Sequence, residues 1–121
     1  MRRKEIGSQG ERIAQDFLKE KGYRLLDTNF RSREGEIDII ARKGKCIVFI
    51  EVRTRSNQSF GTPEESITST KKERLVRLAL AYLQDHPSPS SDWRIDMVAI
   101  ELDGKKVTRV ELIENAVQGP P

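Results

Sequence analysis

The sequence predicts a single α/β domain built on a mixed β-sheet, with the element order α-β-β-β-α-β-β. Three observations support this prediction. Two amphipathic stretches with the period of a helix lie at about residues 6–22 and 70–83. Apolar runs with strand character, separated by Gly and Asp-Gly turns, fill most of the remaining chain. A three-strand meander followed by a helix and further strands is typical of a mixed sheet with helices packed against it.

The first half of the chain is predicted to form a helix followed by three strands. The helix spans residues 6–22, its apolar stripe stops at Gly22, and Glu11 lies at the edge of that stripe. The strands are expected at residues 23–31, 35–43 and 45–54. Between the last two, Gly44 supplies the positive φ that a tight hairpin needs.

The second half is predicted to form a helix and two strands. A polar loop at residues 56–65 precedes the helix, where Thr70-x-x-Glu73 has the form of a capping box, although Thr68 or Ser69 could also cap it. Cations crowd the first turns of this helix, where they oppose its dipole: Lys71, Lys72, Arg74 and Arg77. The strands are expected at 93–102 and 105–113. The domain should span residues 1–114, followed by a flexible tail at 115–121.

Composition narrows the class of protein. A chain of 121 residues with 36% hydrophobic and 34% charged residues is expected to form one soluble domain with a real core. No apolar run approaches the ~20 residues of a membrane span, so no membrane association is expected. The single cysteine, Cys46, excludes an internal disulfide and a cysteine-rich zinc site, which favours a cytoplasmic location.

Two acids stand inside apolar strands, and they are the most informative feature of the sequence. An ionised carboxylate is costly to bury unless it is paired or binds a metal. If Lys43-Gly44 forms a two-residue turn, Asp38 faces Phe49 and Glu51 is its diagonal neighbour on the same face. The two carboxylates could then share one Mg²⁺. A three-residue loop would put them on opposite faces, so the metal site requires a loop of two or four residues.

Other interpretations of these residues stay open. Asp38 and Glu51 could instead pair with Arg53 and another arginine in a buried ion-pair network. Lys71 and Lys72 could form a solvated face or contact phosphates. Several residues have simple structural interpretations: Glu11 as a helix-edge acid, Glu36 as a solvated or supporting acid, Asp96 held by Arg94 or a backbone amide, Phe60 and Trp93 as core residues, and Cys46 as a small buried hydrophobe.

Elimination favours phosphodiester chemistry. The one histidine, His86, precedes Pro87 in a loop, which leaves little room for a Ser-His-Asp or Cys-His system. The sequence contains neither a phosphate-binding Gly-rich loop ending in Lys-Ser or Lys-Thr nor a Gly-x-Gly-x-x-Gly motif. Carboxylates, a metal and cations remain. Basic clusters around an acidic centre, with a net charge of +3, also favour a nucleic-acid partner over a merely solvated surface.

An ordered series of motifs along about nine-tenths of the chain resembles a known group. It comprises Gly10-Glu11, Gly22-Tyr23, Asn29-Phe30-Arg31, Gly35-Glu36-Ile37-Asp38, Phe49-Ile50-Glu51-Val52-Arg53, Phe60-Gly61 and Arg94-Ile95-Asp96. An acid followed about 13 residues later by Glu-x-basic resembles the PD-(D/E)xK, or restriction-endonuclease-like, nuclease superfamily. The whole series is more narrowly similar to the YraN-like family of bacterial proteins, to which archaeal Holliday-junction resolvases are related.

The resemblance implies a restriction-endonuclease-like sheet flanked by helices, and a role for each matching residue. Asp38 and Glu51 would bind Mg²⁺ or Mn²⁺, and Glu11 would be the helix acid beside the site. Arg53 stands where the superfamily usually has lysine. Arginine cannot act as a general base, but it can orient water or stabilise charge on the phosphorane through its forked donors.

These inferences predict a DNA-binding protein that is a metal-dependent endonuclease, and the resemblance to junction resolvases implies branched DNA as its substrate. Its nucleic-acid contacts are expected at Arg55, Lys71, Lys72 and Arg74. A resolvase would have to be a homodimer in order to present two sites to symmetric strands. The alternative is a non-catalytic nucleic-acid-binding or adaptor module on the same fold. A protein-interaction domain without nucleic acid would leave the basic helix start unexplained.

Overall fold

The computed structural model describes residues 3–56, 61–87 and 92–117, with side chains from residue 7 onward. The elements are α1 (Arg3–Glu20), β1 (Arg24–Ser32), β2 (Gly35–Lys43), β3 (Cys46–Ser56), α2 (Ser69–Asp85), β4 (Trp93–Asp103) and β5 (Lys106–Val117). A single 3₁₀ turn, η1 (Glu64–Ser66), lies at the end of the predicted polar loop. The predicted order of helices and strands is therefore confirmed.

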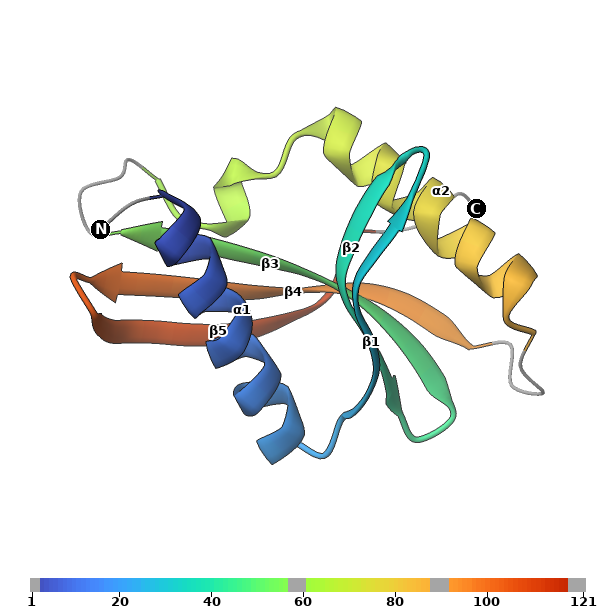
Figure 1. Ribbon diagram of the computed structural model, residues 1–121, viewed down its shortest axis with the longest axis horizontal. Helices are drawn as coiled ribbons and strands as arrows, with labels where there is room; N and C mark the ends of the chain where they lie inside the picture. Colours follow the sequence, from blue (N-terminus) through green and yellow to red (C-terminus); the bar gives the residue numbers. More distant parts are fainter. Residues whose placement is uncertain (1–2, 57–60, 88–91, 118–121) are drawn as a thin grey trace.

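The strands form one mixed sheet in the order β1-β2-β3-β4-β5 (Figure 1). Neighbours β3 and β4 are parallel, and the other neighbouring pairs are antiparallel. Alternate residues of β3 pack into two separate cores: Val48 and Ile50 into one with α1, and Ile47 and Phe49 into one with α2. Because strand side chains alternate between faces, the two helices cover opposite faces of the sheet.

Helix α1 ends as the sequence predicts, just before Gly22. The Tyr23 N–H donates to the Leu18 carbonyl at 3.0 Å, and the Gly22 N–H donates to the Lys19 carbonyl at 3.0 Å. This pair of bonds is a Schellman motif, and it is accompanied by the packing of Tyr23 and Leu18 in the α1 core. The motif turns the chain back towards the sheet, where β1 begins.

The turn between β2 and β3 has an even number of residues, as the predicted metal site requires, but it lies one residue further along the chain than expected. Lys43 pairs with Cys46 and Ile39 with Ile50, so the turn is Gly44-Lys45 rather than Lys43-Gly44. Gly44 has φ of 60° and takes the first turn position, the one at which a two-residue turn of type II′ favours glycine. A Lys43-Gly44 turn of type I′ would force a lysine to positive φ. The offset aligns Asp38 with Glu51, not with Phe49.

Strand β2 changes its orientation at Asp38. Ile39 packs in the α1 core, whereas Ile37 packs in the α2 core, although a regular strand would place both on one face. The paired register with β3 also ends beside this point, at Ile39–Ile50. Asp38 therefore lies where β2 turns away from β3, as Figure 1 shows for the two ribbons.

Three details of the second half differ from the sequence prediction or refine it. Thr68 caps α2 by accepting a bond from the Lys71 N–H at 3.1 Å, so the Thr70 capping box is wrong. Strand β5 continues to Val117, so residues 115–117 belong to the sheet and not to the tail, and residues 118–121 lie outside the described residues. Trp93 packs against the α2 core, as expected, while Phe60 lies outside the described residues.

Asp96 is a fully buried acid with a structural role, as the sequence suggests. Both of its oxygens accept bonds from Arg94 Nε, at 3.1 and 3.0 Å, and Oδ1 also accepts the Asn115 N–H at 3.0 Å. Arg94 in turn donates to the Tyr23 hydroxyl at 2.7 Å. The network joins β4, β5 and the start of β1, and it satisfies a charge that would otherwise be costly to bury.

Candidate functional site

Three carboxylates from two elements converge near the point where β2 leaves β3. They belong to Glu11 on α1 and to Glu36 and Asp38 on β2, and all are half-buried. Each offers one oxygen, and the three oxygens lie within 4.8 Å of one another. We call these residues the acid cluster.

Asp38 is fixed by the backbone of β3. Its Oδ2 accepts the Val52 N–H at 2.8 Å, two residues beyond the last paired residue of β3, Ile50. The side chain thus satisfies a backbone donor at the place where β2 no longer pairs with the strand. This bond holds one oxygen of Asp38 and leaves the other to face its neighbours.

A close contact between α1 and β3 brings Glu11 to the cluster. Gly10 is buried, and a Cβ at this position would lie 2.0 Å from Thr54 Oγ1, which is far inside van der Waals contact. Only glycine therefore lets α1 approach β3 this closely. The Glu11 side chain follows directly and reaches the carboxylates of β2.

Charge is concentrated in the acid cluster, as the pKa of Glu11 indicates. Burial raises this pKa above its usual range, and the nearby charges of Asp38 and Glu36 raise it further, whereas a hydrogen bond from the Asn29 side chain lowers it. One partial counter-charge comes from Arg31, whose Nε lies 3.5 Å from Glu36. The cluster is consequently a place where a cation would relieve repulsion.

Glu51 on β3 lies beside the cluster and is almost completely buried, with 3% of its surface exposed. Its Oε2 lies 3.6 Å from an Arg53 Nη and 3.8 Å from Lys71 Nζ. Burial raises the pKa of Glu51 to about 8, and the charge of Asp38 and a hydrogen bond shared with it act in the same direction. The two cations oppose this rise without cancelling it.

The donor set fits a hard divalent cation. Mg²⁺ binds oxygen ligands at about 2.0–2.1 Å in an octahedron, so adjacent ligands lie about 2.9 Å apart and opposite ones about 4.1 Å. The three oxygens of the acid cluster lie within 4.8 Å of one another, a limit somewhat wider than the separation of opposite ligands. Glu11, Glu36 and Asp38 could hold such an ion, whereas Glu51, the second predicted metal ligand, is not among the three carboxylates whose oxygens lie this close.

Arg53 is held in place by Ser66 of η1. Its Nε donates to Ser66 Oγ at 2.9 Å and its Nη2 donates to the Ser66 carbonyl at 3.0 Å. Ser66 Oγ in turn donates to the Pro63 carbonyl. The guanidinium is thereby oriented with its remaining N–H groups free of Ser66 and one Nη facing Glu51.

An ion pair with the far strand anchors η1. Arg109 on β5 donates to both oxygens of Glu64, at 3.1 and 2.6 Å, and also to Glu101 at 3.2 Å. The bond from Arg109 lowers the pKa of Glu64 to about 2, so the pair stays ionised through the neutral range. The pair thus ties η1, the turn that carries Ser66, to β5.

A small cavity of about 270 Å³ opens beside Glu51 at the start of α2, and we call it the basic pocket. It is lined by three cations and three hydroxyl side chains: Arg53, Lys71, Arg74, Ser66, Thr68 and Thr70. The lining includes two of the four predicted nucleic-acid contacts. The other two, Lys72 and Arg55, lie outside it: Lys72 is exposed on α2 and Arg55 is half-buried on β3.

The structure thus brings together all four residues predicted to act in catalysis and adds others to them. Glu36 joins the cluster directly, although the sequence suggested only a solvated or supporting acid. Ser66 contacts Arg53 without any preceding sequence signal, whereas Asn29, which hydrogen-bonds to Glu11, belongs to one of the motifs that carry the family resemblance. The sequence also allowed a buried ion-pair network of the two strand acids with Arg53 and another arginine. Part of that network is present, because Glu51 pairs with Arg53 and with Lys71, which takes the place of the second arginine.

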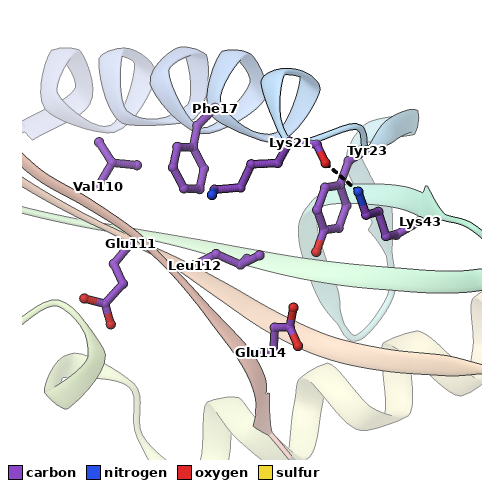
Figure 2. A pocket seen from close by; sticks show the side chains of 8 residues that line it. All are labelled: Phe17, Lys21, Tyr23, Lys43, Val110, Glu111, Leu112 and Glu114. Carbon is purple, nitrogen blue, oxygen red and sulfur yellow. Dashed lines mark hydrogen bonds between the residues drawn. The ribbon is translucent and has the colours of Figure 1, made fainter.

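A larger cavity, of about 590 Å³, lies elsewhere, between the second half of α1 and β5 (Figure 2). Its lining includes Lys21 and Lys43 as well as Glu111 and Glu114, so it carries both signs of charge. Lys43 Nζ donates to the Lys21 carbonyl and lies 5.2 Å from the centre of the Tyr23 ring. The acid cluster and the basic pocket are therefore not part of the larger cavity.

Neither helix, within the described residues, is long and apolar enough to cross a membrane.

Comparison with known proteins identifies one family. Residues 10–100 match the model of the uncharacterised protein family UPF0102, and this span contains the acid cluster and the basic pocket.

Individual relatives extend the similarity to most of the chain. A UPF0102 protein of Moorella thermoacetica is 48% identical over 117 residues, which cover 96% of this chain and 98% of that protein. A UPF0102 protein of Chlorobium phaeobacteroides is 50% identical over 96 residues, which cover 79% and 76%. Another, of Caldicellulosiruptor saccharolyticus, is 43% identical over 117 residues, which cover 96% and 99%. The chain therefore belongs to the UPF0102 family, the YraN-like family that its motifs resemble.

Proposed function

We propose that this protein is a metal-dependent endonuclease of the PD-(D/E)xK type that hydrolyses phosphodiester bonds in DNA. The observation that carries the proposal is the meeting of opposite charges where β2 leaves β3. Three carboxylates lie within 4.8 Å of one another, and the adjacent Glu51 is flanked by Arg53 and Lys71. Acids that suit a divalent cation thus adjoin cations that suit a phosphate.

The roles of the side chains follow from their positions. The acid cluster would hold Mg²⁺ or Mn²⁺, which supplies a Lewis acid for the phosphate and lowers the pKa of water. Arg53, already oriented by Ser66, donates N–H groups to phosphate oxygens and stabilises the negative charge that develops in the transition state. Its guanidinium stays protonated, so its contribution is electrostatic. Lys71 adds a second positive charge on the same side.

Branched DNA is the substrate that the resemblance to junction resolvases favours. Cleavage of two symmetric strands requires two active sites, so this form of the proposal includes a homodimer. A four-way junction should then be cut in preference to a plain duplex, and the active species should sediment as a dimer.

A non-catalytic nucleic-acid-binding module is the second candidate. The observation that favours it is the pairing of Glu51 with both Arg53 and Lys71, because these cations already neutralise part of the charge of the acid in the absence of a metal. Such a module would bind DNA through the same basic residues. Its affinity would still fall linearly with salt on logarithmic axes, as phosphate contacts require.

One experiment separates these functions. Purified protein is incubated with single-stranded, duplex and four-way-junction DNA in Mg²⁺, Mn²⁺ or EDTA. Asp38→Asn and Glu51→Gln are run beside Glu20→Gln, a matched control at an exposed acid of α1. Metal-dependent cleavage that is lost in the two site variants and kept in the control supports the proposal. Cleavage that survives both site substitutions would sink it, and binding without cleavage would favour the module.

A further inference from the structure

The basic pocket is small and has a uniform chemical lining. Its volume of about 270 Å³ lies below the 300–1,000 Å³ of pockets that enclose drug-sized ligands, so it suits a compact group. Every lining side chain bears a cation or a hydroxyl, and neither Asp nor Glu is among these described residues. A compact oxyanion matches both properties.

Positive charge in the pocket exceeds the acid that faces it. Arg53 and Lys71 share the single carboxylate of Glu51 at distances longer than a hydrogen bond. Arg74, within the described part of the chain, forms no ion pair. Lys71 and Arg74 also lie in the first turns of α2, where cations oppose the helix dipole. An anion in the pocket would offset both costs.

Two of the three hydroxyl groups in the lining, those of Thr68 and Thr70, could donate to an anion in the pocket. Thr68 Oγ1 accepts the Lys71 N–H at 3.1 Å, which leaves its own O–H available as a donor. Thr70 adds a second hydroxyl from the next turn position. The hydroxyl of Ser66 is already committed to Pro63, so its part is to hold Arg53 at the wall of the pocket.

We infer that the basic pocket binds one phosphate group of a nucleic-acid strand, and that it does so without a metal. Arg53 and Lys71 connect it to Glu51, so this phosphate would neighbour the one at the acid cluster. The assignment to a nucleic-acid strand rests on the proposed function, whereas the assignment to a phosphate rests on the pocket alone. The phosphate could be terminal or an internal phosphodiester.

The first test uses inorganic phosphate and the full chain in EDTA. Amide and arginine Nε resonances are followed by NMR during titration with phosphate, against chloride at matched ionic strength. Saturable shifts at Thr68, Thr70 and Lys71 are expected. Arg74→Gln should weaken the binding about tenfold through loss of a charge-assisted hydrogen bond. Arg77→Gln is the matched control, because Arg77 lies on the same helix but pairs with Glu34.

Chemical shift changes that never saturate with phosphate would overturn the inference. An equal loss of phosphate affinity in Arg74→Gln and Arg77→Gln would overturn it as well. A protein that binds phosphate in EDTA yet never cleaves DNA with Mg²⁺ would retain the pocket and refute the nuclease. Conversely, DNA cleavage without saturable phosphate binding refutes the pocket and retains the nuclease.

A second titration separates the two sources of phosphate. Short oligonucleotides with a 5′-phosphate, with a 3′-phosphate or with neither are compared in EDTA by the same resonances. Shifts that require a terminal phosphate assign the pocket to strand ends, and equal shifts with all three assign it to internal phosphodiesters. In either case Arg74→Gln should reduce the slope of log affinity against log salt by about 0.7–0.9. Oligonucleotides that leave the pocket resonances unchanged would refute the nucleic-acid assignment.

Discussion

Glutamine in place of Glu51 should make the metal-free protein more stable at alkaline pH. Glu51 keeps its proton in the folded protein up to about pH 8, whereas an unfolded chain releases it near 4.5. Below pH 4.5 the group is protonated in both states and costs nothing. As the pH rises from 4.5 to about 8, only the unfolded chain gains from ionisation, so the folded state loses relative stability. Glutamine has nearly the same shape and does not titrate.

The pKa shift sets the size of this effect. The span from 4.5 to about 8, at 1.36 kcal/mol per pH unit, gives an upper limit of about 5 kcal/mol for the stability lost above pH 8. The side chain is nearly inaccessible to water, so solvent screening reduces this value little. Local rearrangement in the wild type lowers the observed difference, and we expect about 2–4 kcal/mol at pH 8.5.

Urea unfolding in EDTA from pH 4.5 to 8.5 measures the effect. Trp93 is the single tryptophan and packs edge-on to Phe49 in the α2 core, so its fluorescence reports the transition. The free energies of wild type and Glu51→Gln should converge near pH 4.5 and diverge as the pH rises. Mg²⁺ should narrow the gap at pH 8.5 by favouring the ionised carboxylates of the wild type.

Parallel stability curves for the two proteins would refute the reasoning, because they would mean that Glu51 ionises alike in both states. Glu20→Gln serves as the control, since this acid is exposed on α1 and should leave the curve unchanged. A wild type that becomes more stable than Glu51→Gln as the pH rises would reverse the sign and would show that Arg53 and Lys71, rather than burial, dominate the pKa of Glu51.

Three further predictions concern residues that support the site. Ser66→Ala should slow single-turnover DNA cleavage about 10-fold more than it weakens DNA binding, because it removes the bond to Arg53 Nε and leaves the guanidinium held by the Ser66 carbonyl alone; equal losses in rate and affinity would contradict this. Gly10→Ala should lower the free energy of unfolding by about 1–3 kcal/mol in urea, and the double variant with Thr54→Ala should recover most of it; additive losses would exclude the steric explanation. Asp96→Asn should cost about 3 kcal/mol by the same measurement, by breaking a buried ion pair; a loss under 1 kcal/mol would refute that account.

Local sequence patterns predict the elements because periodicity and turn residues act over short distances. They also predict an even hairpin loop between Asp38 and Glu51, which the register of β2 and β3 confirms, but not the change of orientation of β2 at Asp38. The offset of the hairpin is harder to predict, because Gly44 could occupy either turn position. The turn that forms places only Gly44 at positive φ and leaves both neighbouring lysines at negative φ, which lysine prefers. This preference is a backbone property that the hydrophobic pattern of the sequence does not report.

The rest of the site depends on tertiary geometry. Glu36 becomes a candidate metal ligand only because the packing of α1 places Glu11 close to it. That packing depends on the close contact of Gly10 with Thr54. Ser66 meets Arg53 across 13 positions of chain, after a loop with no periodicity to fix its path. The cap at Thr68 and not Thr70 is a choice among adjacent hydroxyl residues that the sequence leaves nearly equivalent.

Arginine at position 53 is the departure from the superfamily pattern, and its contacts give it a physical rationale. Two of its five N–H groups bind Ser66, and one Nη faces Glu51, an arrangement that needs a planar fork with donors on three atoms. A lysine has its donors on a single atom and could not reproduce both bonds to Ser66 while facing Glu51. The position is therefore built for a fixed cation, and not for a group that exchanges a proton. If the protein hydrolyses DNA, the attacking water must be activated at the acid cluster, and Arg53 must act through its charge.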